Sequence, residues 1–179
     1  MKFRLADVDS LLEPGYVEDL RAIPMAQLRE RRAECQRIEV ALSYLRRMVH
    51  GRLDVVYYDL TRRSEGRGSS EFANIVENMD GILAGRIHAH YSGRLTSILA
   101  PDFEEVALEE LDTIAGIDSL QVLPDLTDDE VRVIADRLTD LEEKLSDRRR
   151  HLHDVLDKLH QEIVRRYKTG EANVDSLLQ

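Results

Sequence analysis

The sequence is poor in large aromatic side chains, in cysteine and in long apolar runs. Of its 179 residues, 5% are aromatic and none is tryptophan, which favours helices packed along narrow seams over a thick globular core. The single cysteine, Cys35, excludes an internal disulfide, and its place in a helical pattern predicts a small buried side chain. No apolar run approaches about 18 residues and the N-terminus does not resemble a signal peptide, so we expect no membrane span and a cytoplasmic location.

Positive charge is also scarce, above all in the middle of the chain. The formal net charge is −10, and residues 69–130 hold fourteen Asp and Glu against Arg86 and Arg94 alone. Because an excess of negative charge opposes binding to a nucleic-acid backbone, we expect no direct contact with DNA. We expect the acidic segment 69–126 to be mobile in the free protein, with its scattered Ile, Val and Leu side chains docking on a partner.

Two long stretches of the chain carry a helical repeat of apolar residues. Pro24 suits a first helical position, and the first long helix is predicted over 24–64. The second opens at a capping box, Thr127-x-x-Glu130, and is predicted over 127–170, where Gly170 can end it. Apolar residues recur in steps of three, four and seven, the a and d positions of a coiled coil: Leu28, Cys35, Ile38, Leu42, Leu45, Val49 and Val56, then Val131, Ile134, Leu138, Leu141, Leu145, Leu152, Val155 and Leu159.

These helices predict one all-α domain built as an antiparallel coiled-coil hairpin. Both come to roughly 60 Å at about 1.5 Å per residue, and each has one apolar seam to bury against the other. The remaining segments are then a short N-terminal arm or helix at 1–23, a long acidic linker at 65–126 and a tail at 171–179. Within the linker, apolar spacing predicts short helices over about 69–83 and about 102–111.

A polar motif, E-x3-S-x2-R-x3-H-x3-D, occurs once in each predicted long helix. The copies are Glu39, Ser43, Arg46, His50 and Asp54, and Glu142, Ser146, Arg149, His153 and Asp157, with every pair 103 residues apart. At about 100° per residue, the five side chains of one copy lie within an arc of about 80°, so each copy forms a polar stripe on one helix face. One such stripe is ordinary on a solvated face, but its repetition at fixed spacing indicates selection.

The coiled-coil register places both stripes on the same side of their seams. If Leu42 and Leu138 are a positions, the Glu and Arg residues of both stripes are e positions and the Ser and His residues are b positions. In an antiparallel pair, stripes centred on Arg46 and Arg149 meet about a pseudo-two-fold axis. The expected result is a symmetric polar groove, which suits a symmetric ligand.

The residue types of the stripes suit guanine. An arginine fork can donate to O6 and N7, and a carboxylate can accept from N1–H and the N2 amino group. Guanidinium planes also stack on bases. The neighbouring Arg47, Arg52, Arg148 and Arg150 can supply positive charge for phosphates, although ordinary flank charge of a coiled coil also explains them.

The two stripes resemble the E-x3-S-x2-R-x3-Q-x3-D motifs of the RsiG family of actinobacterial anti-sigma factors. The stretch SYLRRMVHGRLD at 43–54 and the PGY sequence at 14–16 resemble that family too, so the likeness covers the arm and both helices. The resemblance implies an antiparallel helical coiled coil that binds a dimer of cyclic di-GMP. It also implies that the bound dinucleotide joins the protein to the sporulation sigma factor WhiG, which represses transcription without catalysis or another cofactor.

The histidines are where this chain departs from that family pattern. His50 and His153 stand in place of glutamine in both stripes. Histidine can donate or accept one hydrogen bond at this point, but it has one polar arm fewer than glutamine and titrates near neutral pH. The fourth contact of each motif is therefore the one in which this chain differs from that family.

Two other classes of protein remain as alternatives. The first is a coiled-coil scaffold whose stripes only link helices through salt bridges and bind no nucleotide. The second is a carboxylate–histidine metal enzyme in a helical bundle, but the Glu-x-x-His pairs of di-iron sites are absent. His88 and His90 have no Cys or carboxylate cluster at ligand spacing, so we expect no metal site.

Overall fold

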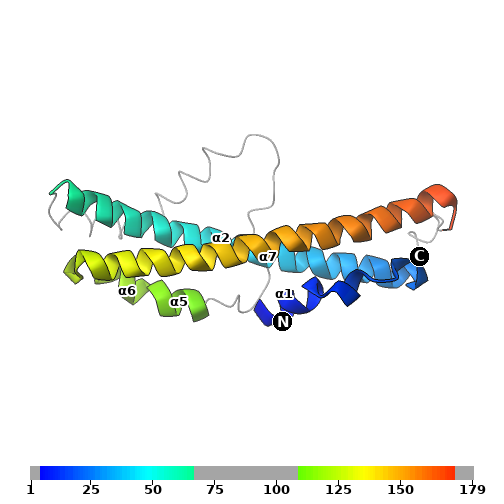
Figure 1. Ribbon diagram of the computed structural model, residues 1–179, viewed down its shortest axis with the longest axis horizontal. Helices are drawn as coiled ribbons and strands as arrows, with labels where there is room; N and C mark the ends of the chain where they lie inside the picture. Colours follow the sequence, from blue (N-terminus) through cyan, green and yellow to red (C-terminus); the bar gives the residue numbers. More distant parts are fainter. Residues whose placement is uncertain (1–4, 67–108, 172–179) are drawn as a thin grey trace. The chain divides into compact units, whose positions relative to one another are not determined.

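The computed structural model describes residues 5–66 and 109–171, and every regular element in these two ranges is helical (Figure 1). The elements are α1 (Leu5–Leu12), η1 (Pro14–Val17), η2 (Leu20–Ala22), α2 (Met25–Ser64), α5 (Glu109–Ala115), α6 (Ile117–Gln121), η3 (Leu123–Asp125) and α7 (Asp128–Thr169). The two long helices, α2 and α7, follow the ranges in which the apolar repeat predicted them. The all-α class is therefore confirmed for the described residues.

Local sequence signals set the ends of both long helices. The predicted capping box at the start of α7 forms, because Glu130 N donates to Thr127 Oγ1 at 3.3 Å and Thr127 N donates to Glu130 Oε2 at 2.7 Å. Gly66 and Gly170 follow the ends of α2 and α7 with φ of 70° and 76°. A residue with a Cβ is strained in this left-handed region, so glycine allows the chain to leave each helix there.

The chain divides into two compact units, each of which holds half of α2 and half of α7. The described part of unit 1 is residues 5–44 and 144–171, and that of unit 2 is residues 45–66 and 109–143. In unit 1, α2 contacts α7 through the bond from Arg149 Nε to Glu39 Oε1, 2.9 Å. A second bond, from Arg29 to Tyr167, lies further toward the start of α2 and the end of α7. The two helices are therefore antiparallel in unit 1.

The same direction holds in unit 2. Arg46 Nε donates to Glu142 Oε1 at 2.8 Å, and Arg63 Nη1 donates to Asp128 Oδ1 at 3.0 Å. Later residues of α2 thus meet earlier residues of α7. The predicted antiparallel hairpin is confirmed.

The apolar seam forms the core of each unit. Every predicted seam residue is buried except Ile134, which is half-buried. The seam side chains that are no more than 2% exposed are Leu28, Cys35, Leu42, Leu45, Val49, Val56, Val131, Leu138, Leu141, Leu145, Leu152 and Leu159. Burial of one such leucine or valine contributes about 1.5–3 kcal/mol, so the seam is the main stabilising feature of the pair.

Two d positions of α2 carry charged residues that are nevertheless buried. Arg52 is 8% exposed and donates from Nη2 to Asp112 Oδ1 at 2.7 Å. Asp59 is fully buried and accepts from Arg62 Nη2 and Arg63 Nε, both at 2.6 Å. Because a buried charge is costly unless it is paired, these contacts fix which elements can cover this part of α2.

Residues 109–126 pack over the part of α2 that carries Arg52 and Asp59, in unit 2. Their apolar side chains Leu111, Ala115, Leu120 and Leu123 are buried. Arg63 adds bonds to the carbonyl oxygens of Leu126, at 2.7 Å, and of Leu123. The expectation that the whole acidic segment 69–126 is mobile is therefore wrong for 109–126, because this part has enough apolar surface to pack on α2.

The helix predicted over about 102–111 also differs from the structure. Its C-terminal part coincides with the start of α5, which continues to Ala115. The remaining residues of that prediction, the helix predicted over about 69–83, and His88 and His90 lie outside the described residues.

The N-terminal arm lies along unit 1. Val8 and Leu11 of α1 are buried, and Arg148 of α7 donates to Asp9 Oδ1 at 2.9 Å. Arg166 of α7 donates from Nη2 to the carbonyl oxygens of Leu20, at 2.7 Å, and Arg21, at 3.1 Å. The arm is thus attached to α7 at both of its ends.

Candidate ligand site

Unit 2 brings residues of both stripes into one cluster. Arg46 and His50 lie one turn apart on α2, and Glu142 lies opposite them on α7. Glu142 Oε1 accepts from Arg46 Nε at 2.8 Å and lies 3.0 Å from His50 Nε2. The e position explains this meeting, because e residues flank the seam and reach across it to the facing helix.

Unit 1 contains the reciprocal cluster. Here the glutamate, Glu39, comes from α2, and Arg149 and His153 come from α7. Glu39 Oε1 accepts from Arg149 Nε at 2.9 Å and lies 3.6 Å from His153 Nε2. Ser43 joins them, since its Oγ accepts from Arg149 Nε at 2.9 Å and donates to Glu39 Oε1 at 2.8 Å.

The two clusters match in exposure as well as in composition. In each, the glutamate side chain is 20% exposed and the arginine side chain is 37% exposed, while the histidines are 49% and 47% exposed. Each arginine is held through Nε, on the inner edge of its guanidinium. A ligand can therefore approach the arginine and the histidine from solvent while the carboxylate is already oriented.

The other three stripe residues, Ser146, Asp54 and Asp157, lie outside these two clusters. Ser146 is half-buried on α7, and Asp54 and Asp157 are exposed one turn beyond the two histidines. The structure thus groups seven of the ten predicted ligand residues into two clusters, Arg46, His50 and Glu142, and Glu39, Ser43, Arg149 and His153. Ligand binding by the ten remains a prediction.

The chain matches the family model described as RsiG-like over residues 14–83 and 118–179. The chain belongs to the RsiG-like family. The matched ranges contain both polar stripes, all of α2 and all of α7. Comparison with curated proteins gives no match.

Membership of the RsiG-like family supports a role of the anti-sigma-factor type. It also implies a sigma factor, in general terms, as the partner. No helix in the described ranges is both long enough and apolar enough to cross a membrane.

Two of the arginines predicted to supply charge for phosphates are engaged elsewhere in this RsiG-like chain. Arg52 is buried against Asp112, and Arg148 binds Asp9 of the arm through Nε and Nη2. Arg150 is exposed and lies 3.4 Å from Asp147, and Arg47 is exposed. The phosphate prediction is therefore wrong for Arg52, which is buried, and it stays a prediction for Arg47, Arg148 and Arg150.

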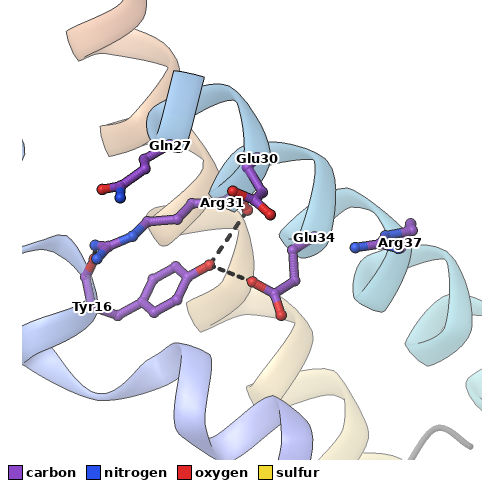
Figure 2. Close-up of a pocket in the computed structure, with 6 residues that line it drawn as sticks. All are labelled: Tyr16, Gln27, Glu30, Arg31, Glu34 and Arg37. Carbon is purple, nitrogen blue, oxygen red and sulfur yellow. Dashed lines mark hydrogen bonds between the residues drawn. The ribbon is translucent and has the colours of Figure 1, made fainter. Parts of the chain in front are cut away.

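A hollow of about 340 Å³ lies between the arm and the start of α2 in unit 1 (Figure 2). Tyr16 fills its floor: its hydroxyl donates to Glu34 Oε2 at 3.0 Å, and Arg31 lies over its ring at 5.0 Å and donates to its carbonyl oxygen. Burial is the main cause that raises the pKa of Tyr16, and burial likewise raises the pKa of the Cys35 thiol beside it. The polar groups of Tyr16, Glu34 and Arg31 thus bind one another, and these contacts attach the arm to the start of α2.

Metal chemistry has no support among the described residues. No group of three or more His, Cys, Asp or Glu side chains there could hold a metal ion.

The buried charged residues that sequence reasoning missed are Arg52, Asp59, Arg62, Glu162 and Arg166. The coiled-coil register was the available signal, because Arg52, Asp59 and Glu162 are d positions and Arg166 is an a position.

Proposed function

We propose that this RsiG-like protein binds cyclic di-GMP at the two Arg–Glu–His clusters and, together with the dinucleotide, holds a WhiG-type sporulation sigma factor. The observation that supports the proposal is the duplication itself. Two clusters with the same three residue types, similar bond lengths and equal exposure suit a ligand that presents the same chemical group twice. Cyclic di-GMP has two equivalent guanines, and a dimer of it keeps a two-fold axis.

Each cluster offers guanine a complementary set of bonds. The Nη atoms of Arg46 or Arg149, whose side chains are 37% exposed, donate to O6 and N7, and Glu142 or Glu39 accepts from N1–H and the N2 amino group. The histidine contributes one further bond, to the base or to a phosphate oxygen.

The existing Arg–Glu bonds do not prevent this exchange of partners. Both are ion pairs between side chains that are at least one-fifth exposed, and such pairs contribute only about 0–1 kcal/mol. A ligand that replaces one N–H···O bond with two or more recovers that cost. The free protein therefore holds the groups in place without competing strongly with the base.

In this proposal the protein is a regulator that catalyses no reaction and holds no resident cofactor. It sequesters its sigma factor in the cytoplasm, where transcription takes place, and it does not contact DNA, since the net charge of the chain is −10. A second function, a coiled-coil scaffold without a nucleotide, is favoured by one specific observation. In both clusters an Arg–Glu bond already links α2 to α7, and helix pairing alone would explain that bond.

Substitution of the cluster arginines separates these two functions. Arg46→Ala and Arg149→Ala should each weaken cyclic di-GMP binding about ten- to a hundredfold, because each change costs about 1–3 kcal/mol of charge-assisted bonding. The free energy of unfolding should change by less than about 0.5 kcal/mol, as is usual for exposed pairs. Arg137→Ala, at an exposed position of α7 outside both stripes, is the control.

Calorimetry with cyclic di-GMP, with and without a WhiG-type sigma factor, measures the affinity, and thermal melting measures stability. If both alanine variants bind the dinucleotide as tightly as Arg137→Ala does, the clusters are not the ligand site. A wild-type chain that binds no cyclic di-GMP under any of these conditions would favour the scaffold.

A further inference from the structure

The histidine of each cluster faces the glutamate through the same ring nitrogen. His50 Nε2 lies 3.0 Å from Glu142 Oε1, and His153 Nε2 lies 3.6 Å from Glu39 Oε1. In both clusters the same carboxylate oxygen also accepts from the arginine Nε. Both histidine side chains are about half exposed, so each keeps one side of its ring toward solvent.

The glutamate determines which nitrogen of the ring carries the proton. An ionised carboxylate can only accept hydrogen bonds, so the bond between His50 and Glu142 needs the proton on Nε2. Neutral imidazole has a single N–H, which leaves Nδ1 of His50 able to accept but unable to donate. The distance of 3.6 Å from His153 to Glu39 is longer than a hydrogen bond, but attraction of an N–H to the carboxylate favours the same tautomer there.

The charged groups of cyclic di-GMP that the arginines and glutamates leave unbound are acceptors. In the proposed complex the arginine takes O6 and N7 of guanine, and the glutamate takes N1–H and the N2 amino group. A carboxylate has about four acceptor sites on its two oxygens, so it can keep the histidine as well. The phosphates remain, and their oxygens only accept. A histidine held by the glutamate through Nε2 can donate to a phosphate only from Nδ1–H, which requires the imidazolium form.

We infer that His50 and His153 are phosphate-binding residues of the dinucleotide site, and that each binds as the imidazolium and takes up a proton when cyclic di-GMP binds. The inference rests on the proposed function for the identity of the ligand. It adds a contact that the arginines and the glutamates do not make. Ligand binding is then coupled to protonation of the chain, so the pH regulates the affinity of the site.

The charged side chains near each histidine are balanced before the ligand binds. His50 faces Glu142 of α7 and has Asp54 one turn after it on α2, while Arg46 and Arg47 lie one turn before it. The corresponding groups around His153 in unit 1 are Glu39 of α2 and Asp157, Arg149 and Arg150 of α7. Among the described residues, two carboxylates and two guanidinium groups thus surround each ring. A bound phosphate adds the negative charge that favours the imidazolium.

The coupling sets the direction of the pH dependence. An ordinary histidine titrates near about pH 6.5. A contact that needs the imidazolium is fully available below about that pH and is lost as the pH rises toward about 8. If the ligand favours the protonated form about tenfold, binding tightens about fourfold per histidine between about pH 8 and 6.5, and roughly fifteenfold for two.

Exchange of histidine for glutamine tests the inference with a matched control. His50→Gln/His153→Gln keeps an N–H donor at both positions but cannot take up protons there. His151→Gln is the control, because His151 is exposed on α7 and lies about 200° around the helix from His153. Calorimetry with cyclic di-GMP at about pH 6.5 and 8, in two buffers of different ionisation enthalpy, gives the affinity and the number of protons taken up. Phosphorus NMR of the bound dinucleotide reports the phosphate contact, and thermal melting checks the fold of each variant.

Wild type and His151→Gln should bind roughly fifteenfold more tightly at the lower pH and should take up protons on binding. The double variant should change by less than about twofold between the two pH values and take up almost none. The phosphorus resonances should move between the two pH values in wild type and stay in place in the double variant.

A pH dependence that survives in the double variant, or that His151→Gln removes, would overturn this role of the two histidines. Proton uptake with unmoved phosphorus resonances would overturn the phosphate contact, because the imidazolium would then bind the base. Wild type that binds cyclic di-GMP equally well at both pH values refutes the inference and leaves the proposed function standing. Absence of binding by wild type at both pH values overturns the proposed function and the inference with it.

Discussion

Asp59→Ala removes the most deeply buried carboxylate of unit 2. Asp59 has no exposed surface, and its two oxygens bind Arg62 and Arg63 at 2.6 Å each. The side chains of these arginines are only 5% and 15% exposed. Alanine therefore removes the nearest negative charge from two guanidinium groups that have little access to water.

The size of the effect follows from the contacts that remain. Removal of one partner from a buried ion pair costs about 3–5 kcal/mol, because the other charge stays buried. Arg63 keeps its bonds to Leu126 O and to Asp128, which places the expected loss near the lower limit, about 3 kcal/mol. This is a large share of the roughly 5–15 kcal/mol by which a typical protein is stable.

Urea unfolding followed by far-ultraviolet circular dichroism measures the change in the free energy of unfolding. Asp136→Ala, at an exposed position of the same unit, should change it by less than about 0.5 kcal/mol. Asp59→Asn should lie between the two, because the amide oxygen still accepts a hydrogen bond. Amide exchange in 109–126 should speed up in Asp59→Ala, since Arg63 ties that segment to α2. A loss below about 1 kcal/mol would refute the reasoning.

Three further outcomes are expected from the described contacts. Thr127→Ala should lower the free energy of unfolding by about 1 kcal/mol in urea titrations, because it removes the N-cap of α7; Thr127→Ser should retain most of it. Hydrogen bonds from Arg165 hold the pKa of Glu162 at about 2, below its usual range, so this pair stabilises the fold above about pH 4 and its contribution is lost as the pH falls through about 2. The urea midpoint should therefore fall less steeply with acid in Glu162→Gln, and an unchanged slope would contradict the assignment. Cys35 is fully buried and burial raises its pKa, so iodoacetamide should modify it at pH 8 only on the timescale of unfolding.

The long helices and their direction were predictable because their signals are local and periodic. The seam positions repeat with the heptad, and the capping box and Gly170 mark ends within a few residues. The antiparallel direction followed from the placement of the two stripes. The meeting of Arg46 with Glu142, and of Arg149 with Glu39, then followed from the e positions.

What the sequence did not reveal depends on partners far away in the chain. From the sequence, Arg52 was interpreted as a surface charge. Its partner Asp112 lies sixty residues later in the chain, and only the structure shows that the two bind. Residues 109–126 read as an acidic linker because their buried side chains, such as Leu111 and Leu120, follow no sustained period. Burial there is decided by the shape of α2 and by the donors of Arg63, and neither is visible in composition.

The reciprocal clusters also limit where this protein can gain or lose residues. In both, the numbers of the arginine and the glutamate add to 188, for Arg46 with Glu142 and for Glu39 with Arg149. The seven-residue interval 39–46 of α2 must therefore keep the same length as the interval 142–149 of α7. A single-residue insertion in either interval would leave one cluster intact and rotate the residues of the other by about 100° on its helix. Natural or engineered length changes in this family should thus be tolerated at the helix ends and the loops, and within these two intervals only as equal changes of a whole heptad in both helices.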